Sequence, residues 1–352
     1  MLTNAAHHKY FDDDHCNWIR YENAPEVYYI NMDRSVERKL NMESHLANVG
    51  LPHFRVRGVV HNEIYVPEDL EKYWRTAWCK SQTDFKPPSK FDVIRDRKSS
   101  LFNYTSIVSG LCGRGKGKNQ LKELGCTTSH LVAMKQAIYS TTAKSRYALI
   151  IEDDVRFPFS VDFDALVATA PTGFGILQLF NSNKDTLADT FQKYARDKSA
   201  LWFESGNLKY WSTCGYLIDR EVMKPIIDAV NYYDNGWQYF KVIAGIQGPC
   251  APPECCTDGK FNQKAPCNLA SAGFQADSFL YALTKTYMLS VPLIANGRGG
   301  DASTFHQDHV ELLHRAAFKR QRSLINDMLT NVVAPPPFAK PACRMTMNVS
   351  QI

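Results

Sequence analysis

The sequence predicts an α/β protein with a mostly parallel central sheet and helices on both faces. Short apolar segments alternate with amphipathic segments along residues 25–325, which is the pattern of repeated βα units. The run YALII at 147–151 is continuously apolar, as in a central strand that is covered on both faces. Ligands of such sheets bind beyond the carboxyl ends of the strands, so polar side chains in those places are candidates for function.

The chain begins its predicted domain with a βα unit. EVYYINM (26–32) predicts a strand, and the helix after it is expected to be capped by Ser35 and to end at Gly50. The expected apolar face of this helix consists of Val36, Leu40 and Ala47. FRVRGVV (54–60) predicts a second strand.

The later elements follow from the same periodicities. TTSHLVAMKQAIY (127–139) starts with threonine caps and has apolar residues at helical spacing, so it predicts a helix that leads into the strand at 147–151. The remaining expected elements are strands at 174–180 and 210–218, a helix within 221–231 that contains Pro225, a helix at 275–288 and a strand at 289–295.

Composition divides the chain into one domain and two peripheral segments. The polar N-terminal segment is expected at 1–24, the single domain at 25–325 and a Pro-rich tail at 326–352, where VAPPPFAKPA (333–342) is not expected to form a regular element. Within the domain, 65–120 is interpreted as an insertion with local helix near 68–79, and 248–268 as a Cys-rich loop.

Charge and hydropathy exclude two classes of function. The net charge is only +5, with 22% charged residues of both signs interspersed, so a nucleic-acid binder is not expected. No apolar run reaches the length of a membrane span, and the N-terminus lacks the layout of a signal peptide. The expectation is a cytoplasmic protein without a membrane segment, and a lumenal location stays open if residues precede this N-terminus.

The sequence contains ten cysteines, and in a cytoplasmic protein most of them are expected to be free thiols. The crowded loop at 248–268 is the exception, because a structural disulfide or a zinc site remains an alternative there. Its four cysteines are Cys250, Cys255, Cys256 and Cys267.

Three adjacent acids, Glu152, Asp153 and Asp154, directly follow the strand at 147–151. One interpretation is a solvated turn, since Asp favours turns after strands. The other is a metal site, because carboxylate oxygens are the ligands of Mg²⁺ and Mn²⁺ and a cation would relieve the repulsion among three like charges. The triplet alone does not decide between them.

Four separated segments, one of which contains the acidic triplet, resemble in their order the glycosyltransferase family that includes the collagen galactosyltransferases and the bacterial lipooligosaccharide galactosyltransferases. INMDR (30–34) with Arg38 is similar to the family's opening motif, and GCTTSH (125–130) is similar to its helix start. EDDVRF (152–157) is similar to its acidic motif. YW (210–211) with GYLI (215–218), and ADSFL (276–280), are similar to its late strand and helix.

The resemblance implies the nucleotide-sugar-binding fold called GT-A and a Mn²⁺ or Mg²⁺ ion that bridges the diphosphate of a UDP-sugar. Asp154 would bind the metal, Asp153 would bind it or support a ligand, and Glu152 would reach toward the donor ribose. Asn31, Asp33 and Arg38 would contact the nucleotide. The alternative for the last two is a simple ion pair across the helix start.

Asp277 is the residue that the resemblance assigns as the base for the acceptor hydroxyl. The alternative is an ordinary helix cap, for which Asp is common. Direct displacement by an activated hydroxyl would invert the anomeric centre.

Several weaker candidates complete the survey. His306 or His309 could add a late metal ligand, Asp301 could border the donor, and His130 could pack under the sheet or touch a ligand. GLCGRGKG (110–117) partly fits a phosphate-binding P-loop, but Gly117 stands where Ser or Thr should be, and KNQLKE is expected to delay the helix after it.

The function expected from these residues is transfer of galactose or glucose from a UDP-sugar to a hydroxyl of a glycan or of a hydroxylated protein. Two alternatives remain open. One is a catalytically inactive domain that binds sugar nucleotides or glycans, and the other is an enzyme that hydrolyses the donor. The sequence does not name the sugar.

Overall fold

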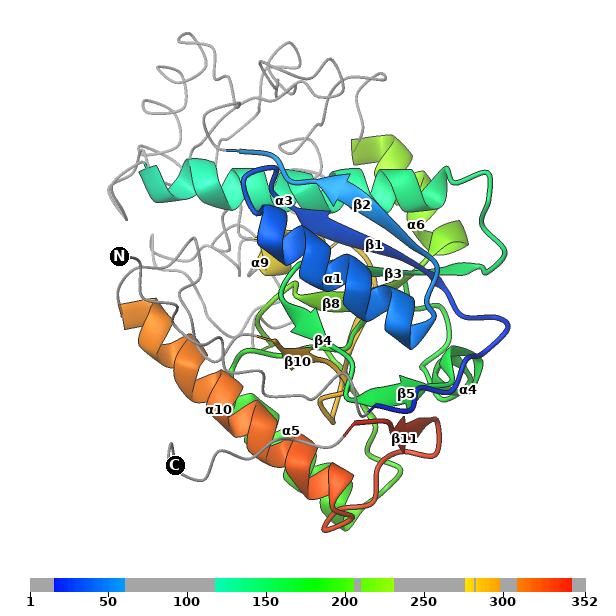
Figure 1. Ribbon diagram of the computed structural model, residues 1–352, viewed down its shortest axis with the longest axis vertical. Helices are drawn as coiled ribbons and strands as arrows, with labels where there is room; N and C mark the ends of the chain where they lie inside the picture. Colours follow the sequence, from blue (N-terminus) through cyan, green and yellow to red (C-terminus); the bar gives the residue numbers. More distant parts are fainter. Residues whose placement is uncertain are drawn as a thin grey trace, which may run out of the picture.

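The computed structural model describes residues 16–60, 118–205, 210–230, 276–281, 283–297 and 309–343. These residues form an α/β structure around a seven-stranded sheet with helices on both faces (Figure 1), which confirms the predicted class. The expected helix near 68–79, nearly all of the 65–120 insertion and the Cys-rich loop at 248–268 lie outside the described residues.

The sheet is mixed. In spatial order its strands are β2 (His53–Arg57), β1 (Glu26–Asn31), β3 (Tyr147–Glu152), β8 (Gly215–Asp219), β6 (Ile176–Gln178), β9 (Thr286–Leu289) and β7 (Trp202–Glu204). β1 is parallel to β2 and β3, and β6 is parallel to β9. β8 is antiparallel to β3 and β6, and β7 is antiparallel to β9. The expectation of a mostly parallel sheet is therefore corrected, because β8 enters from the edge at which β3 ends and has to run back across the sheet.

Helices cover both faces of the sheet because each buried strand sends alternate side chains to opposite sides. Val27 and Tyr29 belong to one apolar core, while Tyr28 between them belongs to the other. The first core involves α1 (Val36–Val49), α4 (Phe163–Ala168), α5 (Lys184–Arg196) and α10 (His309–Leu329). The second involves α3 (Lys118–Ile138), α6 (Arg220–Val230) and α9 (Ala276–Leu280).

Two short strand pairs extend the first core away from the main sheet. β4 (Val155–Arg156) pairs with β10 (Ala295–Asn296), and β5 (Phe159–Val161) pairs with β11 (Ala339–Pro341), both antiparallel. The segment that directly follows the acidic triplet is therefore held from two sides.

Most predicted elements are present with shifted ends. The strands expected at 26–32, 54–60, 174–180 and 210–218 are β1, β2, β6 and β8, and the helix within 221–231 is α6 with Pro225 inside it. α1 ends as predicted at Gly50, which has the left-handed φ of 77°. Its predicted apolar face is wrong, because Val36 and Leu40 are each 59% exposed and the buried side chains are Met42, His45, Leu46 and Val49.

Two other helix predictions are corrected. α3 begins at Lys118 rather than near 127, so KNQLKE is helical, and Thr127 and Thr128 are buried inside the helix rather than capping it. The helix expected over 275–288 ends at Leu280, and Thr286–Leu289 is strand β9. Pairing with β6 and β7 decides the conformation of that segment. The strand expected at 289–295 is therefore reduced to the end of β9 and the start of β10.

The described parts of the two peripheral segments, 16–24 and 326–343, pack on the domain. Trp18 donates from Nε1 to the Phe157 carbonyl at 2.9 Å, and Phe338 is 2% exposed beside strand β11. The prediction that 333–342 forms no regular element is wrong, because β11 lies within this segment. Pro341 is the last residue of β11, and proline is tolerated at the end of an edge strand.

A disulfide joins Cys16 to Cys343, which are 327 residues apart in the sequence. The expectation of free thiols is wrong for this pair, because the fold brings the two segments together beside Phe157. Among the other described cysteines, Cys126 and Cys214 form no disulfide.

None of the described helices is both long enough and apolar enough to cross a membrane.

A buried ion pair joins the start of β1 to the start of α6. Arg220 donates to Glu26 at 2.9 Å, and the two side chains are 9% and 8% exposed. Tyr28 and Thr142 also donate to this carboxylate. Burial opposes ionisation, but the three donors and the Arg220 charge together hold the pKa of Glu26 below its ordinary value.

Arg220→Met is expected to lower the free energy of unfolding by about 3–5 kcal/mol, because it leaves the Glu26 carboxylate buried without its cation. Lys39→Met is the matched control, since Lys39 and Glu43 form an exposed pair that contributes about 0–1 kcal/mol. Urea denaturation of the two variants measures the difference. Equal losses would contradict the assigned role of the buried pair.

Reduction of the Cys16–Cys343 disulfide is expected to lower the free energy of unfolding by about 2–5 kcal/mol, because the bond constrains the unfolded chain. Peptide mapping without reductant should recover the two cysteines in one linked fragment. Recovery of both as alkylated thiols from the unreduced protein would show that the bond is absent.

Candidate functional site

The candidate site lies where three neighbouring strands end at the same edge of the sheet. Asn31, the last residue of β1, is opposite Arg57 of β2, and Ile30 is opposite Glu152, the last residue of β3. Asp153 and Asp154 form the turn from β3 to β4. Parallel pairing therefore brings the opening motif of the chain and its acidic triplet to one place.

Asp153 accepts hydrogen bonds from side chains of both β1 and α1. Its Oδ2 accepts from Asn31 Nδ2 at 2.6 Å, and its Oδ1 accepts from Arg38 at 2.8 Å. The Asp153 side chain is 6% exposed, so both contacts are screened little by water. Asn31 and Arg38 thus hold the acidic turn against β1 and α1, and their predicted contact with a nucleotide stays a prediction.

Asp33 lies beside this cluster and pairs with two arginines of β2. Arg55 donates to its Oδ1 at 2.6 Å and Arg57 to its Oδ2 at 2.7 Å, and these hydrogen bonds lower the pKa of Asp33 below its usual range. Arg55 also donates to Asn31 Oδ1 at 2.9 Å. The alternative of an Asp33–Arg38 pair is wrong, because Arg38 turns to Asp153 instead.

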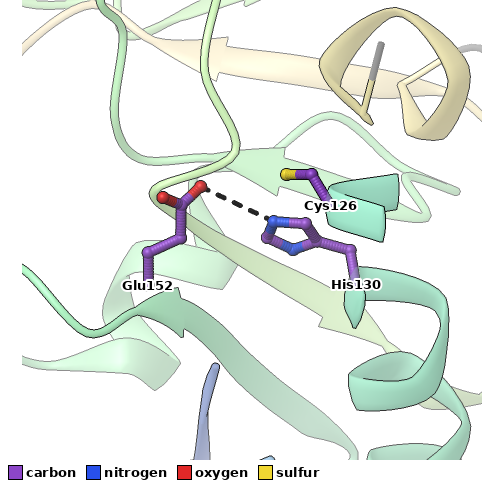
Figure 2. A group of neighbouring side chains, drawn as sticks. All are labelled: Cys126, His130 and Glu152. Atoms are coloured by element: carbon purple, nitrogen blue, oxygen red, sulfur yellow. Dashed lines mark ion pairs between the residues drawn. The ribbon is translucent and has the colours of Figure 1, made fainter. Parts of the chain in front are cut away.

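Glu152 points to the other side of β3, toward α3. Its Oε1 accepts from the Thr213 hydroxyl at 3.1 Å and lies 3.6 Å from His130 Nε2 (Figure 2). Cys126, one turn earlier on α3, completes a group whose ligand atoms all lie within 4.8 Å of one another. Burial opposes ionisation of Glu152, but His130, Thr213 and Arg38 together lower its pKa.

Asp154 is half-buried and lies on the same turn. Its backbone carbonyl accepts from the Gly297 amide at 2.6 Å, and a Cβ at Gly297 would come within 3.2 Å of that oxygen. The carboxylates of Glu152 and Asp154 form a second group with the buried Cys214 thiol, again within 4.8 Å. Burial raises the pKa of Cys214, so the two carboxylates are the charged members of this group.

Asp277 contacts the loop before β8, and this loop in turn contacts Glu152 of the acidic triplet. It lies in the first turn of α9, and its Oδ2 accepts from the Ser212 amide at 3.0 Å, while the Tyr281 hydroxyl donates to the Ser212 carbonyl at 2.6 Å. Ser212 has a left-handed φ of 92°, which costs energy for a residue with a Cβ. The next residue, Thr213, donates to Glu152. Asp277 and Glu152 are thus separated by two loop residues.

Asp301, His306 and the Gly-rich segment 110–117 lie outside the described residues, and His309 is the first residue of α10. The helix after the Gly-rich segment starts at Lys118 without the expected delay. Gly117 still occupies the position that a P-loop needs for Ser or Thr.

Sequence reasoning missed four residues that organise the site. Arg55 and Arg57 could have been recognised, because residues two apart on a strand share one face. Ser212 and Tyr281 had no recognisable signal, since they matter through a loop conformation and a contact between distant segments.

No protein-family model matches the chain, and comparison with curated proteins gives no match either. Function is therefore inferred from the side chains themselves.

Arg38→Met is expected to lower the free energy of unfolding by about 1–3 kcal/mol, because it leaves the buried Asp153 carboxylate with one donor fewer. Arg57→Met, which affects the 56% exposed Asp33, is the control and should cost less than about 1 kcal/mol. Thermal and urea denaturation provide the comparison. A cost for Arg38→Met no greater than that of the control would mean that Asp153 does not depend on Arg38.

Proposed function

We propose that the chain is a metal-dependent glycosyltransferase of the GT-A type, which moves a hexose from a UDP-sugar to an acceptor hydroxyl with inversion. One observation carries this proposal. Two acids at the end of a central strand, Glu152 and Asp154, lie close together, and the loop that contacts Glu152 is held by a third acid, Asp277, from another helix. Donor activation and acceptor activation require acids in two such places.

The donor set fits a hard divalent cation. Glu152 and Asp154 offer carboxylate oxygens, which suit Mn²⁺ or Mg²⁺, and these ions typically take one or two protein carboxylates and complete their shell with water and phosphate oxygens. When bound, such an ion supplies Lewis-acid stabilisation of the departing diphosphate. Asp153 supports this pair from behind, because Asn31 and Arg38 fix the turn that it shares with Asp154.

The basic side chains beside the acids suit the rest of the donor. Arg55 and Arg57 lie on one face of β2 and are 27% and 39% exposed, so they border the strand ends while they hold Asp33. Guanidinium groups recognise phosphate oxygens with paired hydrogen bonds. We assign them to the nucleotide diphosphate, together with the predicted contacts of Asn31, Asp33 and Arg38.

Asp277 would take the proton of the acceptor hydroxyl as that oxygen attacks the anomeric carbon. Its carboxylate is oriented by the Ser212 amide, which donates to Oδ2 at 3.0 Å. Tyr281, one turn later on the chain, holds the same loop residue through its carbonyl. The orientation of the base and that of Thr213 beside Glu152 are thereby coupled.

The test is release of UDP from UDP-galactose and UDP-glucose with Mn²⁺, with and without glycan and hydroxylated-peptide acceptors. Acceptor-dependent release is expected. Asp154→Asn should lower the rate about 100-fold or more, because Lewis-acid stabilisation is worth several kcal/mol. Asp277→Asn should lower it about 10²–10⁴-fold, as loss of a general base does, while donor binding is retained.

Asp189→Asn is the control, since Asp189 is 57% exposed and forms a surface pair with Lys193. Release that needs no acceptor would identify a hydrolase, and metal-dependent UDP binding without release would identify an inactive binding domain. Full transfer activity of Asp277→Asn would show that Asp277 is not the base. Neither binding nor release would contradict the proposed function as a whole.

A further inference from the structure

The group of potential metal ligands that Cys126 and His130 form with Glu152 lies on the α3 side of this carboxylate. Cys126 and His130 are four residues apart on α3, so they share one face of the helix. Figure 2 shows the Cys126 thiol and the His130 ring both directed toward Glu152 at the end of β3. One helix and one strand thus contribute sulfur, nitrogen and oxygen donors within 4.8 Å of one another.

The separation of His130 and Glu152 fits a shared cation better than a direct contact. His130 Nε2 lies 3.6 Å from Glu152 Oε1, which is too long for a hydrogen bond of normal strength. Two ligand atoms about 2.1 Å from a tetrahedral zinc ion lie about 3.4 Å apart. The observed distance is therefore close to the spacing of two ligands of one ion.

His130 is also oriented as metal-binding histidines are. Its ring is 1% exposed, and Nδ1 lies 3.0 Å from the Tyr216 hydroxyl, which is itself buried on β8. A hydrogen bond to one ring nitrogen fixes the tautomer and directs the other nitrogen to its ligand. Glu152 is oriented in turn by Thr213. Two of the three ligands thus have supporting partners of the kind that tune metal sites.

We propose that Cys126 Sγ, His130 Nε2 and a Glu152 carboxylate oxygen form a binding site for a zinc-type divalent cation. A thiolate with an imidazole favours Zn²⁺ over Mg²⁺, Ca²⁺ or Mn²⁺, which prefer oxygen ligands. The Cys126 thiol releases its proton to solvent when the ion binds. Three protein ligands leave one tetrahedral position for water or another small ligand.

The site shares Glu152 with the pair that is assigned to the hard cation. Glu152 is grouped with Asp154 on one side and with Cys126 and His130 on the other. Zinc at the new site would therefore compete for the carboxylate that the donor site uses. The zinc site itself does not depend on the proposed transferase function, because its ligands are defined without a sugar nucleotide.

The experiment uses the full chain, stripped of metal with a chelator and titrated with Co²⁺, which reports thiolate ligands by a charge-transfer band. We expect that the wild type binds one equivalent of Co²⁺ more than Cys126→Ser, with a charge-transfer band that the variant lacks. One equivalent of Zn²⁺ should remove this band. His130→Gln should remove the same band. Tyr216→Phe, which loses only the orienting hydroxyl, should weaken binding about 10–100-fold.

Cys214→Ser is the matched control, because Cys214 is the other described cysteine that is grouped with Glu152. It should retain the band. Loss of the band in Cys214→Ser, or an unchanged band in Cys126→Ser, would overturn the assignment. The variants are compared after their metal-free melting curves have been shown to match the wild type.

A measurement on the wild type alone decides the matter if a variant fails to fold. Zn²⁺ should protect Cys126 from alkylation, as followed by mass spectrometry of its peptide. Alkylation of Cys126 at the same rate with and without Zn²⁺ would refute the site. Metal binding is the only readout in these arms, so failure of the transferase assay leaves their outcome unchanged.

Discussion

The arrangement of the candidate site depends on how the structure neutralises three adjacent negative charges. Asp153 is held between Asn31 and Arg38, so the middle acid of the triplet turns into the protein. Glu152 and Asp154 then lie on either side of it and share a second group of potential ligands. Asp153 and Asp154 form the turn after β3, and with Asp153 directed to Asn31 and Arg38 the carboxylates of Glu152 and Asp154 lie together. The metal chemistry proposed for the chain follows from this division.

The loop before β8 couples the acidic triplet to the rest of the fold. Ser212 adopts a left-handed conformation that is maintained because Asp277 of α9 accepts from its amide and Tyr281, directly after α9, donates to its carbonyl. Thr213 then reaches Glu152, and Gly215 starts the antiparallel strand beside β3. The reversed direction of β8 is thus the feature that brings Asp277 near the acids, since a parallel strand would start at the opposite edge.

Glu152 belongs to both groups of potential metal ligands in the site. It lies between a group of oxygen ligands that suits Mn²⁺ or Mg²⁺ and a group with sulfur and nitrogen ligands that suits Zn²⁺. If both proposals hold, the two metal sites compete for the Glu152 carboxylate. His130, which the sequence left undecided between packing and ligand contact, is buried and yet faces Glu152.

The sequence by itself determined the α/β class, the strand that ends in the acidic triplet and the glycine that ends α1, because local periodicity and turn chemistry specify them. Only the tertiary structure decided the reversed strand β8, the strand conformation of Thr286–Leu289, the Cys16–Cys343 bond and the partners of Asp153. These features arise between segments far apart in the chain. Their energies depend on which surfaces meet, and no local pattern of residues contains that information.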